Sequence, residues 1–132
     1  MLSPKVTDNL LRHVVIAWNG SLEATRLVGH SLDLLHTAGR VSIITAVSGQ
    51  GADTAPSDLA NYLMWHGIRA HPLAAGSTSD GIPAAILAGA TRGEATMLVM
   101  GAYTHSRIRQ FLLGGVTRHV LEHSDIPVLM EH

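Results

Sequence analysis

HVVIAWNG, residues 13–20, is the stretch of sequence that decides the fold. Residues 13–18 form a continuous apolar run rich in β-branched side chains, and Asn19-Gly20 ends that run with turn-forming residues. Such a run predicts a strand buried on both faces, as the strands of a parallel sheet are. Ser21 can then cap a helix, because apolar side chains recur at spacings of three and four as far as residue 35. We expect one helix there, with Gly39 as its C-terminal cap.

The alternation of strand and helix continues to the end of the chain. It predicts a strand at 41–47, a helix at 57–66, a strand at 68–74, a helix ending near 92, a strand at 96–100, a helix at 114–123 and a strand at 127–130. Pro72 interrupts the third strand, which should therefore lie at a sheet edge. Regular β-α alternation predicts an α/β fold with a parallel sheet and helices on both faces. We expect an N-terminal extension over 1–12 and one domain over 13–132.

Composition narrows the possible functions. The chain has 132 residues, no cysteine and a formal net charge of −1. The lack of cysteine excludes disulfides, thiolate metal sites and cysteine nucleophiles. A nucleic-acid-binding domain would normally be basic, and the longest apolar runs are too short to span a membrane. Residues 1–12 contain no apolar segment typical of a signal peptide. We therefore expect a cytoplasmic protein that binds neither nucleic acid nor a membrane.

Glycine marks the loops that should follow the first and fourth strands. In an open parallel sheet, ligands bind beyond the carboxyl ends of the strands where the strand order reverses. Gly101 ends the fourth strand, and Gly114-Gly115 opens the next helix with Thr117 in its first turn. Free amides and the helix dipole at such a position could hold a phosphate. The alternative is that these glycines only form tight turns. The pattern is neither a Walker A loop nor a complete G-x-G-x-x-G.

Two segments resemble the universal stress protein family. They are AWNGSLEATR at 17–26 and LVMGAYTHSRIRQFLLGGVTRHVLEHSDIPVLMEH at 98–132. The likeness covers nearly all of the chain from His13, and is closest to the second half of tandem bacterial members of that family. The nucleotide-binding branch carries glycine, two residues, glycine, nine residues, glycine and then serine or threonine. Here the four motif positions hold Gly101, Thr104, Gly114 and Gly115, and Val116 and Thr117 follow as in the family.

The resemblance implies both an architecture and a ligand. The architecture is a three-layer α/β sandwich around a five-stranded parallel sheet of order 3-2-1-4-5. The ligand is an adenine nucleotide, ATP or AMP, in a protein that regulates stress responses. Its adenine and ribose would lie near Ala17, Asn19, Val47, Met100 and Gly101, beside Thr104, and its phosphates on Gly114, Gly115, Val116 and Thr117. Asn19 stands in place of the usual aspartate, and Thr104 in place of the second glycine. We therefore expect weak binding.

The resemblance also implies a homodimer through the strand at 127–130, which ends the chain as an edge strand. A nucleotide-free dimer that acts as a protein–protein interaction module is the alternative function, with a partner that the sequence does not identify. No G-x-S-x-G elbow supports nucleophilic catalysis, so we assign no catalytic residue and expect weak ATP hydrolysis at most.

Histidine and tryptophan offer the remaining candidates. Nine histidines are present, and His119 and His123 are four residues apart. A third metal ligand is not evident, so we expect half-buried packing roles and no metal site. His66 is expected on the same helix face as the core residues Leu59 and Leu63. Of the two tryptophans, Trp18 is expected in the core or in a pocket wall, whereas Trp65 marks either an interface or the ordinary surface.

Overall fold

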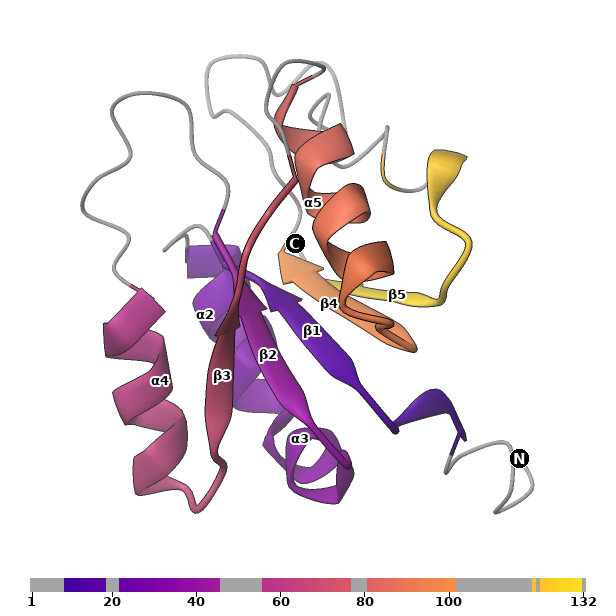
Figure 1. The fold of residues 1–132 in the computed structure, drawn as a ribbon. Helices are drawn as coiled ribbons and strands as arrows, with labels where there is room; N and C mark the ends of the chain where they lie inside the picture. Colours follow the sequence, from indigo (N-terminus) through magenta and orange to yellow (C-terminus); the bar gives the residue numbers. More distant parts are fainter. Residues whose placement is uncertain are drawn as a thin grey trace.

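Five parallel strands form one sheet in the order β3-β2-β1-β4-β5. The computed structural model describes residues 9–18, 22–45, 56–76, 81–101, 120 and 122–131. The strands are β1 (Val14–Ala17), β2 (Val41–Ile44), β3 (Ala70–Leu73), β4 (Met97–Gly101) and β5 (Val128–Glu131). The helices are α2 (Leu22–His30), α3 (Leu32–Thr37), α4 (Pro56–Trp65) and α5 (Ile82–Arg92). The predicted α/β class and strand order are confirmed (Figure 1).

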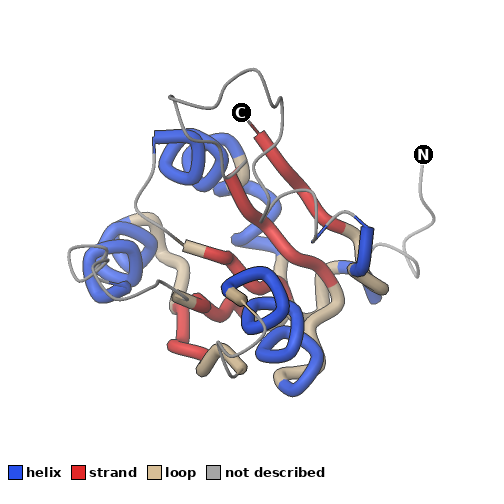
Figure 2. Tube along the Cα trace, turned by 90° about the horizontal axis from the view of Figure 1, so that it is seen from above, coloured by secondary structure: helices blue, strands red, loops and turns tan. Residues whose placement is uncertain are grey.

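Alternation along β1 divides the core into two layers. Val14 and Ile16 pack with Leu27 and Leu63 of α2 and α4, on one face of the sheet. Val15 and Ala17 pack on the other face with α5 and with Val120. Since successive side chains of a strand point to opposite faces, four consecutive apolar residues serve both layers. Viewed from above, helices lie on both sides of the strands (Figure 2).

The helix expected after β1 is divided into two. Ser31 separates α2 from α3 with φ −104° and ψ 7°, outside the α-helical range. Its amide donates to the Val28 carbonyl at 3.1 Å, and its carbonyl then accepts from Leu35 at 2.9 Å. The chain therefore bends at the buried Ser31, between two short helices. The prediction of one continuous helix was wrong here.

Gly39 acts through close approach and is not the cap of α3. Ala38, which is extended with ψ 142°, holds the C-cap position. The Gly39 amide donates to the Leu11 carbonyl at 2.9 Å. A Cβ at Gly39 would lie 2.8 Å from the backbone oxygen of Arg12. Glycine is thus needed where the turn before β2 passes the segment that leads into β1.

β3 occupies one edge of the sheet, as Pro72 predicted. Proline is tolerated there because an edge strand has one side without ladder partners. Pro83 lies in the first turn of α5, also as expected. Leu11, which falls in the predicted extension, is only 8% exposed and packs in the core with β1.

A buried histidine, His13, lies at the amino-terminal end of β1. It was not identified as a candidate residue from the sequence. Its side chain is 7% exposed. Nδ1 lies 2.8 Å from the Gly93 carbonyl, and Nε2 lies 2.7 Å from the Ser42 hydroxyl. A carbonyl can only accept, so Nδ1 carries the proton, and in the neutral ring Nε2 accepts from Ser42. One imidazole therefore connects β1, β2 and the end of α5.

Candidate functional site

The strand order reverses between β1 and β4, and their carboxyl ends lie side by side. Ala17 pairs with Met100, one residue before the end of β4 at Gly101. The chain leaves β1 toward β2 on one side, whereas β4 lies on the other side. In open parallel sheets, ligands bind beyond the carboxyl ends of the strands at such a reversal of strand order. The structure thus brings together three of the predicted site residues, Ala17, Met100 and Gly101.

These three residues can offer a ligand little besides their backbone. Ala17 is 0% and Met100 is 1% exposed, and both side chains lie in the α5 layer of the core. Gly101 is buried as well. A ligand at this edge would therefore take its specificity from the loops that follow. The other predicted site residues lie outside the described residues: Asn19, Val47, Thr104, Gly114, Gly115, Val116 and Thr117.

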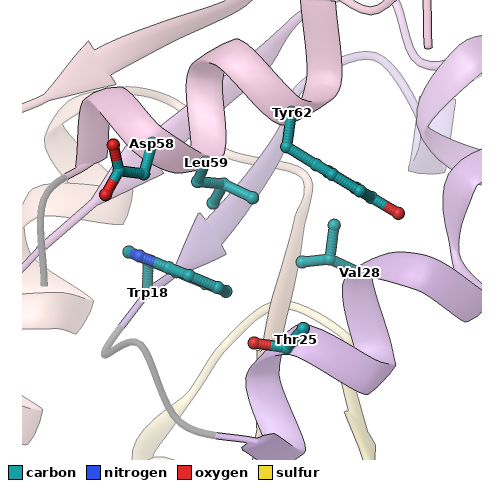
Figure 3. A pocket seen from close by; sticks show the side chains of 6 residues that line it. All are labelled: Trp18, Thr25, Val28, Asp58, Leu59 and Tyr62. Atoms are coloured by element: carbon teal, nitrogen blue, oxygen red, sulfur yellow. The ribbon is translucent and has the colours of Figure 1, made fainter. Parts of the chain in front are cut away.

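A pocket of about 240 Å³ opens beside this edge, between α2 and α4 (Figure 3). The described residues that line it are Trp18, Thr25, Val28, Asp58, Leu59 and Tyr62. Val28 and Leu59 are 2% and 3% exposed and form its apolar wall. The pocket thus has an apolar inner wall, with the exposed residues Thr25, Asp58 and Tyr62 around it.

Trp18 links the pocket to the sheet. Its amide donates to the Ile44 carbonyl at 2.9 Å, which continues the β1–β2 ladder one residue beyond β1. Strand alternation then turns its side chain to the face that carries α2 and α4. The expectation that Trp18 lies in the core or a pocket wall is confirmed.

Helical spacing brings the remaining lining residues together. Asp58 and Tyr62 are four residues apart on α4, and Thr25 and Val28 are three apart on α2, so each pair shares one face. The Tyr62 ring lies 4.7 Å from that of His66, centroid to centroid. Sequence reasoning did not propose Thr25, Asp58 or Tyr62 as site residues. Helical spacing could have predicted that Asp58 and Tyr62 share a face of one helix. It could not have predicted that Thr25, on another helix, lies opposite them.

The histidines expected to be part of the core are at the surface where they are described. His66 and His123 are exposed, so the expected burial was wrong for both. His119 lies outside the described residues. Within the described ranges, no group of three His, Asp or Glu residues could hold a metal ion. Nor is any helix of the described part long and apolar enough to cross a membrane.

The fold is that of a doubly wound α/β protein. In this class the ligand site lies beyond the carboxyl ends of the strands where the strand order reverses, here between β1 and β4. Within that class, residues 75–132 match the universal stress protein family. The resemblance seen in the sequence is thereby confirmed. No protein with a curated function matches the sequence.

Solved structures of universal stress proteins share this fold. A universal stress protein from Archaeoglobus fulgidus is 18% identical, with a TM-score of 0.67, and the match covers 91% of this chain and 93% of that one. A second, from Archaeoglobus fulgidus DSM 4304, is 26% identical with a TM-score of 0.72. That match covers 92% of this chain and 45% of the other. A universal stress protein in complex with cAMP is 24% identical, with a TM-score of 0.66 and coverage of 92% and 96%.

Proposed function

We propose that this protein is a regulator of the universal stress type that binds an adenine nucleotide weakly beyond the carboxyl ends of β1 and β4. The observation that carries the proposal is the pairing of Ala17 with Met100 at the switch point, directly before the glycine-marked loop. Gly101 precedes that loop, and Gly114-Gly115 follows it at the family's spacing. Backbone amides at such a place can hold phosphate without a charged side chain.

Two further observations support a nucleotide ligand. Residues 75–132, which match the family, include the whole loop from Gly101 to Thr117. A protein of the same fold was solved with cAMP, so this architecture can accept an adenine nucleotide.

Calorimetric titration with ATP, AMP and cAMP tests the proposal. We expect dissociation constants in the micromolar range or weaker. Thr104→Gly should tighten binding about tenfold, because a residue other than glycine costs about 1–2 kcal/mol in a left-handed conformation. Gly114→Val should abolish binding by filling the space a phosphate needs. Thr91→Gly, at an exposed position of α5, is the control for a general effect of the added glycine. Negligible heat from both the unmodified chain and Thr104→Gly would contradict the proposal.

The edge strand β5 favours a second candidate function, a dimeric protein–protein interaction module. In the sheet of described strands, β5 pairs with β4 on one side only. Edge strands of this kind pair readily with a further strand. If the protein forms a dimer but binds none of the three nucleotides, the result would favour the interaction module over the nucleotide-binding regulator.

A further inference from the structure

We propose that the pocket between α2 and α4 is a binding site for a small organic cation, an amine or quaternary ammonium ion. This proposal does not depend on the nucleotide, because it concerns side chains on the opposite face of the sheet from Ala17 and Met100. The chemistry of the pocket lining carries it.

Two aromatic rings bound the pocket. Trp18 reaches it from the end of β1 and Tyr62 from α4, and both rings extend along the hollow (Figure 3). A Cβ at Gly29 would lie 4.0 Å from the Tyr62 hydroxyl, so this side chain reaches across to α2. The faces of tryptophan and tyrosine attract cations, and the attraction increases when water is excluded. Val28 and Leu59, which are nearly fully buried, make the inner wall apolar.

The described residues that line the pocket carry charge of one sign. Asp58 contributes a carboxylate to the lining from α4, and Trp18 contributes its indole from the end of β1 (Figure 3). The described lining residues include no lysine, arginine or histidine. A cation on the indole face would therefore gain attraction from both the ring and the carboxylate, whereas an anion would be repelled. The phosphates of a nucleotide are thus poor ligands for this pocket.

The size of the pocket limits the ligand further. At about 240 Å³, it is smaller than the sites of roughly 300–1,000 Å³ that hold drug-sized molecules. A trimethylammonium group with a short apolar or hydroxylated chain is of suitable size.

Choline and its neutral isostere 3,3-dimethylbutan-1-ol provide a matched pair of probes. The chain has two tryptophans, so Trp65→Phe leaves Trp18 as the only indole reporter. In that background, we expect choline to change the Trp18 fluorescence and to bind at least tenfold more tightly than the isostere. Equal affinities, or no change with choline, would overturn the proposal.

Asp58→Asn tests the role of charge. It should weaken choline binding about tenfold and leave binding of the isostere unchanged. Asp33→Asn is the matched control, since it removes an acidic residue from the first turn of α3, outside the pocket. An equal loss in both variants would assign the effect to general charge and contradict the site. Thermal unfolding confirms that both variants fold, and Tyr62→Leu provides a second variant that should also weaken choline binding.

Competition with ATP separates this pocket from the proposed nucleotide site. We expect saturating ATP to leave the choline titration unchanged, even if ATP itself binds. Displacement of choline by ATP would make the pocket part of the nucleotide site and overturn the proposal. Absence of ATP binding, with choline binding intact, would contradict only the proposed function.

Discussion

His13 is buried and makes two hydrogen bonds that join three segments, and this predicts a large effect of its removal. His13→Leu would leave the Gly93 carbonyl and the Ser42 hydroxyl without their imidazole partners. A buried polar group left unpaired costs about 1–3 kcal/mol. We expect the free energy of unfolding to fall by about 3 kcal/mol, measured by urea denaturation.

Two variants control for this prediction. Ser42→Ala breaks only the bond to Nε2 and should cost about 1 kcal/mol. His71→Leu changes an exposed histidine on β3 and should alter stability by less than about 0.5 kcal/mol. A loss for His13→Leu no larger than that for His71→Leu would show that the imidazole contributes little.

Sequence patterns did not reveal His13, for a physical reason. Its partners are 29 and 80 residues away in the chain, and one of them is a backbone carbonyl. Periodicity reports which face of an element a side chain shares, but it contains no information on such distant partners. For the same reason His66, which follows α4 near its apolar stripe, was expected in the core although it is exposed.

Two helical glycines, Gly89 in α5 and Gly29 in α2, should have opposite effects on stability when each is replaced by alanine. Gly89 lies where α5 crosses the chain after β3, and a Cβ there would approach the Ala74 oxygen at 2.6 Å and the Ala75 Cα at 3.0 Å. Both are backbone atoms, so Gly89→Ala requires the helix to shift. We expect a loss of about 1–3 kcal/mol despite the better helix propensity of alanine.

Gly29 in α2 is the matched position. The nearest atom to its added Cβ is the Tyr62 hydroxyl at 4.0 Å, an ordinary contact. Gly29→Ala should therefore stabilise the protein by up to about 1 kcal/mol. The same urea titrations measure both variants, and a gain for Gly89→Ala would show that α5 does not lie against residues 74–75 as described.

Local patterns predicted the existence and order of the elements but not their exact course. The apolar runs at β1 and β4 identified the central strands, because a strand buried on both faces requires such residues. The bend at Ser31 was missed, because an apolar spacing of three and four continues unbroken from α2 into α3. At the candidate site, the resemblance to the family implied that Ala17, Met100 and Gly101 lie near one another. The pocket beside it was not predicted, since it depends on how α2 and α4 pack across Trp18.

For the whole molecule, we predict a homodimer in which β5 strands of two copies pair. The Leu98 amide donates to the Pro127 carbonyl at 2.9 Å, which sets the register of β4 and β5. In a parallel ladder the inward and outward amides alternate, so the amides of Val128 and Met130 face away from β4. Met130→Pro removes one outward donor and spares the inner ladder. It should convert the dimer to a monomer, as measured by light scattering, and removal of residues 125–132 should do the same at some cost in stability.

Trp65 provides the contrasting test of this interface. Its side chain is 89% exposed on α4, far along the chain from β5. Trp65→Ala should leave the dimer intact if β5 forms the interface. A monomer from Trp65→Ala, or an unmodified chain that is monomeric at micromolar concentration, would contradict pairing through β5.

Pro72 at the opposite edge limits how far strand pairing can extend. β3 has four residues, and a proline at its third position cannot donate a hydrogen bond to an incoming strand. A copy that docked its β5 against β3 would meet this gap, so head-to-tail addition of copies is disfavoured. Pairing of β5 with β5 uses up the open edge of both copies and closes the assembly at two. Pro72 therefore disfavours the addition of further copies at the β3 edge. We expect the protein to form dimers and not fibres, even at high concentration.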